Sequence, residues 1–367
     1  MIFPRALVPV SVLALLALTS PAASAGADTG AAGPPPAPRR TVSAWLPYWQ
    51  QDGAYRDALA HADQLHTVSP FWYEMTSTQR ITAHPGAGEH RIIDGLHRAG
   101  IKVVPTVTEA PNAAAMAALL TDPSRRAAHA DTLLRLADSR PYDGLDLDYE
   151  RMNHSADPAV LRRVRNGFSA LVSEVCARLH ARGKQCTVAV YPRTHASDTA
   201  PAYDYARLGR AVDRLRIMGY NLHNALGPPG PLSSPAWYDA ILRYATSRVP
   251  ADRIEMGIPA YGWDYRAGDR ARATHRTTRE AEALRRRVGA PYALDAASKT
   301  PHFTYADNGR RREVWYQDAR GIAAHLPVLH RHGVVNTALW ALDFEEAGLW
   351  PTLERGARRE MRARTGP

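Results

Sequence analysis

The sequence contains little lysine, little cysteine and, after its first residues, no long hydrophobic run. Only three of its 46 basic residues are lysine (Lys102, Lys184 and Lys299), so 43 are arginine. We attribute this skew, and the net charge of +10, to a GC-rich genome. A nucleic-acid partner would rest on charge alone, and we predict none. The content of 45% hydrophobic and 22% charged residues is ordinary for a globular protein and disfavours disorder, collagen and coiled coil.

The first hydrophobic run predicts an export signal. Leu7–Leu18 is mostly apolar, Arg5 gives a positive start, and Ala23–Ala25 has the A-x-A pattern of a cleavage site. The run is too short to span a bilayer, and no later stretch approaches transmembrane length. We therefore expect residues 1–25 to be a signal peptide and the mature protein to be secreted, with no membrane anchor after cleavage. Residues 26–40 lack an apolar period and predict a disordered Pro/Ala/Gly linker.

The two cysteines fit an exported protein. Cys176 is expected on a helix and Cys186 on the next strand, with nine residues between them. A disulfide closing this loop would stabilise the fold by about 2–3 kcal/mol, and two buried thiols are the alternative. Neither cysteine lies in a Cys/His cluster, so we predict no metal site and no cysteine nucleophile.

Eight short runs with strand character alternate with helical patterns. The runs are Thr41–Tyr48, His66–Tyr73, Ile101–Val107, Gly144–Glu150, Cys186–Tyr191, Leu215–Tyr220, Ile254–Pro259 and Asn336–Ala341. Helix starts are marked by Pro123, Pro158 and Pro235, each of which follows an Asp or Ser cap. This alternation predicts an α/β fold with a parallel sheet closed into a (β/α)8 TIM barrel. An open doubly wound sheet is the alternative, but no glycine-rich phosphate loop follows the first strand.

One gap is too long for a single crossover helix. Residues 262–316, between the seventh and eighth strands, contain a helical pattern at Thr277–Val288 and short extended pieces. We predict a small α+β insertion there, on the rim of a barrel that spans residues 41–355. Residues 356–367 form a basic tail, and we expect a monomer.

The strongest motif is a run of four acids within eight residues: Asp143, Asp146, Asp148 and Glu150. Side chains alternate along a strand, so the last three share one face. In a barrel that face points to the interior or the mouth, where burying like charges costs folding free energy. Neighbouring carboxylates cannot all ionise cheaply, so at least one retains its proton near neutral pH. Glu150 is last on the strand and nearest the mouth, which is the profile of a general acid.

The acidic run has two other interpretations. Acids at alternate positions are also typical of an EF-hand calcium loop, but Arg151 lies where that loop needs glycine. A solvated edge strand is disfavoured because Leu145 and Leu147 alternate with the acids. We therefore predict neither a metal nor a cofactor.

The run DGLDLDYE, Asp143–Glu150, resembles the D-x-x-D-x-D-x-E signature of glycoside hydrolase family 18, the chitinase-like enzymes, and all four acids are in place. The resemblance covers most of residues 41–352, including the insertion. Tyr261–Trp263 and Val314–Tyr316 resemble the branch of spore-cortex and cell-wall N-acetylglucosaminidases.

The resemblance implies substrate-assisted retaining catalysis, in which the 2-acetamido oxygen of the substrate attacks the anomeric carbon and forms an oxazolinium ion. Glu150 would protonate the leaving oxygen and later activate water. Asp148 would bind and orient the acetamido N–H, Asp146 would share a proton with Asp148, and Asp143 would support the motif.

The resemblance also implies substrate-binding residues. Met218, Tyr220 and Asn221 lie in a segment that resembles the family's M-x-Y-D, and Tyr220 would donate to the acetamido carbonyl. Asn221 stands where many members have aspartate; it keeps hydrogen bonding but cannot carry charge, so the resemblance does not extend to the pH optimum or to the contacts that distort the substrate. Trp340 resembles the tryptophan that forms the floor under the reacting sugar.

Other aromatic residues are weaker candidates. Tyr48 and Trp72 lie at expected strand ends, where a barrel places its site, and either could bind sugar or pack in the core. Trp237 and Trp350 lie in or near expected helices and are assigned to packing.

The leading hypothesis is a secreted hydrolase that cleaves β-1,4 linkages of N-acetylglucosamine-containing polysaccharides, with chitin or chito-oligosaccharides as the default substrate. A peptidoglycan N-acetylglucosaminidase is an alternative within that class. A non-catalytic sugar-binding protein on the same barrel is a second hypothesis, although lectin-like relatives usually lack the acid that Glu150 supplies.

Overall fold

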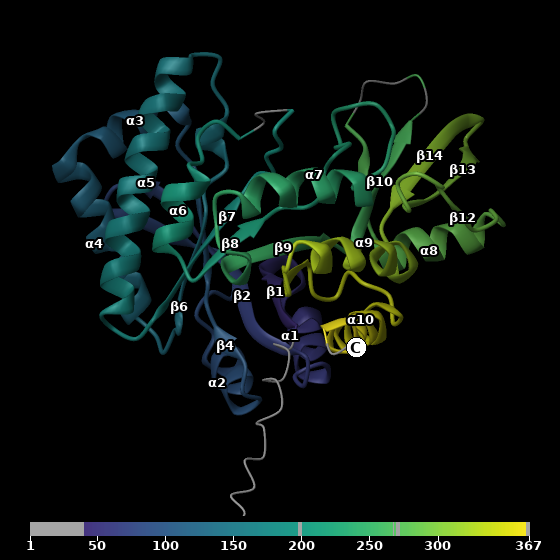
Figure 1. Cartoon of the computed structure of the whole chain (residues 1–367), viewed down its shortest axis with the longest axis horizontal. Coiled ribbons are helices and arrows are strands. Elements are labelled where there is room, and N and C mark those ends of the chain that lie inside the picture. Colours follow the sequence, from purple (N-terminus) through teal and green to yellow (C-terminus); the bar gives the residue numbers. More distant parts are fainter. Residues whose placement is uncertain (1–39, 197–199, 267, 269–271, 365–367) are drawn as a thin grey trace, which may run out of the picture. The chain divides into compact units, whose positions relative to one another are not determined.

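Eight strand positions close into a parallel barrel (Figure 1). Their order is β1 (Thr41–Pro47), β15 (Asn336–Trp340), β9 (Ile254–Pro259), β8 (Arg214–Ile217), β7 (Gln185–Val190), β6 (Gly144–Asp148), β4 (Lys102–Val103) with β5 (Thr106–Glu109), and β2 (Leu65–Ser77). Pairing of β1 with β2 closes the ring. The computed structural model describes residues 40–196, 200–266, 268 and 272–364, so the predicted signal peptide and nearly all of the predicted linker lie outside the described residues. The predicted (β/α)8 barrel is confirmed.

Helices connect the strands in the order expected of this barrel. They are α1 (Gln51–Ala60), α2 (His90–Arg98), α3 (Ala113–Thr121), α4 (Pro123–Asp138), α5 (Pro158–His180), α6 (Tyr205–Ala211), α7 (Pro235–Thr246), α9 (Ala319–Arg331) and α10 (Leu349–Arg364). Asp122, Asp157 and Ser234 accept backbone N–H groups at the starts of α4, α5 and α7. Those three predicted helix starts are therefore correct, because an oxygen-bearing cap followed by proline satisfies the first turn. Helix α10 continues through residues 356–364 of the segment that we assigned to a basic tail.

The part of the chain between β9 and α9 forms a second sheet. It is antiparallel, in the order β11 (Thr274–Thr277), β10 (Tyr261–Arg266), β14 (Arg310–Tyr316), β13 (Pro301–Asp307) and β12 (Ala293–Leu294). Helix α8 (Thr278–Arg287) begins with a capping box formed by Thr277 and Glu280. A shorter hairpin joins β2 to β3 (Arg80–Ala83).

The alternation of β6 divides its side chains between two environments. Leu145, Leu147 and Tyr149 are completely buried on the outer face, where the Tyr149 ring lies 5.6 Å from that of Phe168 in α5. The acids therefore occupy the inner face, as the pattern predicts. The strand thus packs against helices through one face and presents its charges to the barrel interior through the other.

The predicted disulfide is present. Cys176 of α5 and Cys186 of β7 are bonded, with their Cα atoms 5.2 Å apart. Among the described residues, no helix combines the length and the apolarity needed to cross a bilayer.

Candidate active site

Asp143, the first acid of the motif, lies at the end of the barrel opposite the mouth. It precedes β6, and its Oδ2 accepts the backbone N–H of Val103 at 2.7 Å and contacts Nε2 of His97 at 2.8 Å. It therefore joins β6 to the neighbouring strand β4 and to α2, and takes no part in the pocket.

Asp146 is the second acid and is surrounded by donors. It is completely buried, and it accepts from Trp45 Nε1 at 3.0 Å, Thr106 Oγ1 at 2.9 Å and Thr187 Oγ1 at 2.6 Å. The guanidinium of Arg216 lies 3.2 Å from its Oδ2. Each of its oxygens is thus satisfied without a bond to Asp148.

Arg216, on β8, neutralises the barrel interior. Its Nε donates to Glu255 at 2.6 Å, one of its terminal nitrogens donates to Ser69 at 2.6 Å, and its guanidinium lies 5.2 Å from the ring of Trp45. The side chain is almost completely buried, and paired, hydrogen-bonded charges are the form in which ions are tolerated in a protein interior. The cost of placing Asp146 inside the barrel is therefore offset locally.

Asp148 is in a different condition. It is 5% exposed, and its Oδ1 is buried without a hydrogen-bond partner among the described residues. Burial raises its pKa well above the usual value, and the nearby charges of Glu150, Asp146 and Glu109 raise it further. Asp148 is therefore a proton-holding carboxyl with a vacant acceptor.

Glu150 follows the last residue of β6 and precedes a 3₁₀ turn, η2 (Arg151–Asn153). Burial raises its pKa, while a hydrogen bond from the Tyr191 hydroxyl and the nearby His154 act in the opposite direction. A carboxyl with a raised pKa retains a proton near neutrality, which is what a general acid needs.

The pocket around these two carboxyls has a volume of about 650 Å³. The predicted residues that line it are Asp148, Glu150, Met218, Tyr220, Asn221 and Trp340. Residues from the loops after β6, β7 and β8 and from the second sheet complete its wall, so it opens at the carboxyl-terminal ends of the barrel strands, where such barrels place their sites.

Asn221 is fixed by the second sheet. Its φ of 65° lies in the left-handed region, which asparagine tolerates better than most residues. Its Oδ1 accepts from the Tyr261 hydroxyl at 2.7 Å and from Trp263 Nε1 at 3.1 Å. Both donors belong to β10, so the polar wall beside Tyr220 is held by residues outside the barrel.

Trp340 ends β15 and forms an aromatic floor. Its ring lies 5.3 Å from that of Phe71 and 5.7 Å from that of Trp45, and both pairs meet edge to face. Its peptide bond to Ala341 is cis. The half-buried ring has one region packed and another facing the pocket, as a sugar platform requires.

Other predicted aromatics are placed differently. Trp72 is completely buried and donates to Gln51 Oε1 at 2.6 Å, so a glycan cannot reach it, and its prediction as a substrate-binding residue is corrected. Tyr48 is half-buried, stacks on His84 at 4.2 Å and is not among the pocket-lining residues, so its role stays a prediction. Trp350 is in the core, whereas Trp237, which we assigned to packing, lines the pocket.

Several residues of the site had no signal strong enough to be found. Glu109 ends β5, and Tyr191 directly follows β7. Tyr261 and Arg272 come from the second sheet and its loop, and Arg216 is the buried cation of the interior. Position at a strand end could have marked the first two. The others depend on which strands become neighbours.

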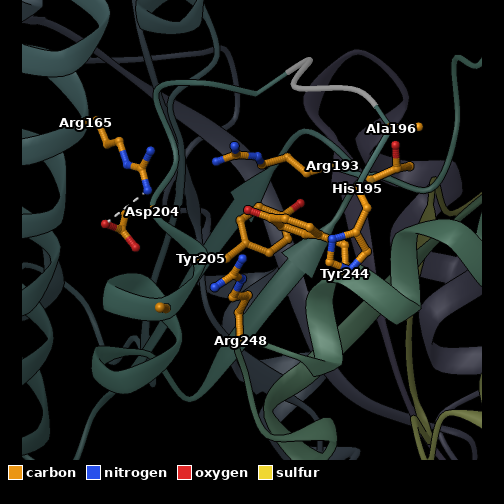
Figure 2. Close-up of a pocket in the computed structure, with 10 residues that line it drawn as sticks. Arg165, Arg193, His195, Ala196, Asp204, Tyr205, Tyr244 and Arg248 are labelled. Atoms are coloured by element: carbon orange, nitrogen blue, oxygen red, sulfur yellow. Dashed lines mark ion pairs between the residues drawn. The ribbon is translucent and has the colours of Figure 1, made fainter.

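A separate basic cavity of about 440 Å³ lies beside the loop after β7 (Figure 2). Arg165 and Asp204 form an ion pair of 3.4 Å, which is the dashed line in Figure 2. The guanidinium groups of Arg193 and Arg248 lie 5.2 Å and 5.5 Å from the ring of Tyr244. Arginines therefore dominate the charge of this cavity.

Within the described part of the chain, no group of three or more His, Cys, Asp or Glu side chains is arranged to hold a metal ion. The groups that line the pocket include the carboxyls of Asp148 and Glu150, the phenols of Tyr191, Tyr220 and Tyr261, the imidazole of His154 and the guanidinium of Arg272. This set suits proton transfer and stabilisation of a developing cation.

Comparison with known proteins gives a consistent result. The sequence profile described as "Glycosyl hydrolases family 18" matches residues 44–345. The "Uncharacterized glycosylase YvbX" of Bacillus subtilis is 26% identical over 229 residues, which are 62% of this chain and 65% of that protein. The "Cortical fragment-lytic enzyme" of Bacillus anthracis is 27% identical over 198 residues, 52% of this chain and 45% of that protein. The chain thus spans between about half and two thirds of the length of these relatives.

Among solved structures, the chitinase from Chromobacterium violaceum superposes with a TM-score of 0.77 at 27% sequence identity. That match covers 86% of this chain and 98% of the chitinase.

Proposed function

Because the chain belongs to glycosyl hydrolases family 18, we propose that it hydrolyses β-1,4 linkages next to N-acetylglucosamine, with Glu150 as general acid and base. One observation carries this proposal: the buried Asp148 Oδ1 has no partner among the described residues, in a pocket that Glu150 also lines. Buried polar atoms are almost always paired, so a vacant acceptor there suits a donor brought by the substrate.

The 2-acetamido N–H of an N-acetylglucosamine unit is such a donor. When this N–H bonds to Asp148, the acetamido oxygen is turned toward the anomeric carbon and attacks it. Glu150 gives its proton to the leaving glycosidic oxygen, and an oxazolinium ion forms. Water then attacks the same carbon and returns a proton to Glu150, which regenerates the acetamido group and retains the anomeric configuration.

The remaining wall residues support this sequence of steps. The Tyr220 hydroxyl donates to the acetamido oxygen, and burial raises the pKa of that phenol well above its usual value, so it remains a donor. Trp340 stacks against the sugar ring. Asn221, held by Tyr261 and Trp263, offers its amide to a sugar hydroxyl without adding charge.

The test is Glu150→Gln, assayed on a chito-oligosaccharide reporter. We expect kcat to fall by about 10²–10⁴-fold while the Kd for the oligosaccharide stays within about twofold, since only proton transfer is lost. Glu174→Gln, on the surface of α5, is the matched control and should keep full activity. Undiminished turnover in Glu150→Gln would refute the role of Glu150. Absence of turnover in the parent at high enzyme concentration would favour the non-catalytic sugar-binding alternative.

Secretion forms part of the same proposal. The export signal expected in residues 1–25 would place the enzyme outside the cell with its polysaccharide substrate. Fractionation of the native producer with an antibody against the barrel would detect it in the medium, and retention in the cytoplasm would contradict this part.

A second candidate substrate is a glycan that carries carboxylates, such as peptidoglycan. Arg272 lines the active pocket and has no ion pair with any carboxylate of the described residues. Thr194 lines both this pocket and the basic cavity of Figure 2, so further arginines lie beside the same loop. Chitin is neutral and offers no anionic partner to Arg272, whereas the lactyl and peptide carboxylates of peptidoglycan could pair with it. The name of the cortical fragment-lytic relative supports the same choice.

This choice is tested with Arg272→Gln on two substrates. We expect kcat/KM on purified peptidoglycan fragments to fall by about tenfold, with little change on chito-oligosaccharides. Mass spectrometry of the products identifies the bond that is cleaved. Equal loss on both substrates would show that Arg272 does not read a carboxylate.

A further inference from the structure

A buried carboxyl group accepts hydrogen bonds from the turn that carries the proposed general acid. Glu109, at the end of β5, is 3% exposed and is not among the residues that line the active pocket. Its Oε2 accepts the backbone N–H of Glu150 at 2.9 Å, and its Oε1 accepts that of Met152 at 2.8 Å. Both oxygens are therefore committed to the turn that carries the acid.

The turn needs such a partner. The first N–H groups of a helical turn have no acceptor within it, and the side chain of the N-cap residue usually provides one. The N-cap of η2 is Glu150 itself, and its side chain makes no capping hydrogen bond. If the Glu150 carboxyl capped its own turn, it would fold back onto the backbone and leave the pocket. A cap supplied by a different strand leaves that carboxyl available to the substrate.

We infer that Glu109 is a positioning residue for the general acid: it caps η2 from the neighbouring strand and thereby fixes Glu150 with its carboxyl in the pocket. This inference rests on the proposed function. No part of it requires Glu109 to touch the sugar.

The Glu109 side chain also belongs to the cluster of acidic groups around Glu150. Burial raises its pKa to about 8, although the N–H groups of Met152 and Glu150 act to lower it. The groups that face it are carboxyls and phenols: Glu150, Asp148, Tyr149, Tyr191 and Tyr203. The guanidinium of Arg151, the residue that follows Glu150, donates instead to the Ala110 carbonyl at 2.8 Å. Because the pKa of Glu109 is about 8, this residue is mostly protonated at neutral pH, and its oxygens act there as hydrogen-bond acceptors rather than as a fixed negative charge.

The experiment compares Glu109→Gln with Glu109→Asp and with a matched control. The Glu109→Gln side chain keeps the shape but has only one acceptor oxygen. The Glu109→Asp side chain keeps both carboxyl oxygens but is too short to hold both N–H groups. Glu345→Gln is the control, because Glu345 is another buried glutamate whose pKa burial raises to about 8, and it does not line the pocket.

We expect Glu109→Gln to lower kcat by about 10–100-fold with KM within about twofold, since a misplaced acid slows the step without weakening binding. The limb of the pH profile on which the acid loses its proton should also move, because the acid is no longer held in place beside Tyr191. Glu109→Asp, which is too short to hold both N–H groups, should lower kcat as well. Glu345→Gln should lower Tm by about as much as Glu109→Gln does, and it should leave both kcat and the limb unchanged.

A direct titration makes the result independent of activity. In protein labelled with ¹³C at the glutamate carboxyls, the Glu150 signal is assigned by its loss in Glu150→Gln and followed with pH. We expect its pKa to differ from that of the parent in Glu109→Gln, because the carboxyl is no longer held in place beside Tyr191, and to be unchanged in Glu345→Gln. An unchanged Glu150 titration together with an unchanged kcat would overturn the inference, as would a loss in Tm alone.

Failure of the inference and failure of the proposed function are distinguishable. If the parent cleaves no glycan, the proposed function fails, while the titration of Glu150 still decides the role of Glu109. If Glu109→Gln does not fold, Glu109→Asp decides, since an unchanged kcat there refutes the positioning role.

Discussion

Asp146 and Asp148 lie two residues apart on the same face of one strand, yet their surroundings are opposite. Asp146 accepts from an indole, two hydroxyls and a guanidinium. Asp148 has a buried oxygen with no partner among the described residues and a pKa that burial and three neighbouring acids raise. Two residues along one strand therefore separate a carboxylate that a buried arginine neutralises from a carboxyl that has an oxygen without a partner among the described residues.

The difference shows how the barrel divides its inner face. Toward the interior, Arg216 joins Asp146 to Glu255, so the acids there contribute to the packing of the strands. Toward the mouth, no cation of the described residues compensates Asp148 and Glu150 as directly, and both retain protons more readily than usual. Acidic side chains buried near the mouth at a cost in stability are what we expect of a site that binds a partly cationic transition state.

The largest effect that tests this comparison is expected from Asp146→Asn. It should lower the free energy of unfolding by about 3–5 kcal/mol, because removing one member of a buried ion pair leaves the other charge uncompensated. Urea unfolding measures the loss. Thr187→Val, which removes one neutral donor to the same carboxyl, is the control and should cost only about 1 kcal/mol. If both variants lose the same amount, the interior is not an ionic network.

Asp148→Asn should show the reverse pattern. We expect kcat on a chito-oligosaccharide to fall by about 10²–10³-fold, since an amide cannot lose a proton and so cannot supply the negative charge that would stabilise the proposed oxazolinium ion. The free energy of unfolding should stay within about 1 kcal/mol of the parent or rise, because the variant removes a costly buried acid and breaks no ion pair seen among the described residues. Steady-state kinetics and urea unfolding of the same preparation give both values. A loss of stability equal to that of Asp146→Asn would abolish the distinction between the two aspartates.

The smallest effect is a pH dependence of stability. The raised pKa of Asp148 means that the folded state holds a proton that the unfolded chain releases near pH 4, so the contribution of Asp148 to stability falls as pH rises above that point. Buried His129 and His325, whose pKa values burial lowers to about 4, act in the opposite direction between pH 4 and 6.5. These histidines contribute equally in Asp148→Asn and in the parent, so their contribution cancels from the difference between the two unfolding free energies.

That difference should grow in favour of the variant by about 1 kcal/mol for each pH unit between pH 5 and the folded pKa of Asp148. Urea titrations at about pH 5, 6.5 and 8 measure it. A difference that does not change with pH would mean that Asp148 is ionised in the folded protein throughout this range.

Much of the fold could be predicted because local patterns and global topology agree. All eight strand runs form barrel strands, and the caps before Pro123, Pro158 and Pro235 begin helices where expected. The third strand departs from its predicted form, since β4 and β5 are separated around Pro105, which has no N–H for the sheet. The number of strands in the second sheet could not be predicted, because its short strands are stabilised by pairing with partners far along the chain.

The site was predictable where the chemistry lies on one strand and hidden where it depends on neighbours. Asp148 and Glu150 follow from alternation along β6. Arg216 and Glu109 do not, because an arginine or a glutamate at the end of a strand is ordinary until the strand beside it is known. Trp72 shows the converse, since its position at a strand end suggested a pocket residue, but its ring is completely buried.

The second sheet has a consequence for how this molecule could be altered. Strand β10 supplies the two side chains that fix Asn221, and the loop that follows it supplies Arg272, whereas the reacting carboxyls stand on β6 and directly after it. Under the proposed function, bond cleavage depends on residues of β6 and the residue after it, whereas the choice of polymer depends on residues of the second sheet and its loop. Residues 261–316 could be exchanged as a cassette between relatives, transferring preference for one glycan over another while the machinery that breaks the bond is left in place.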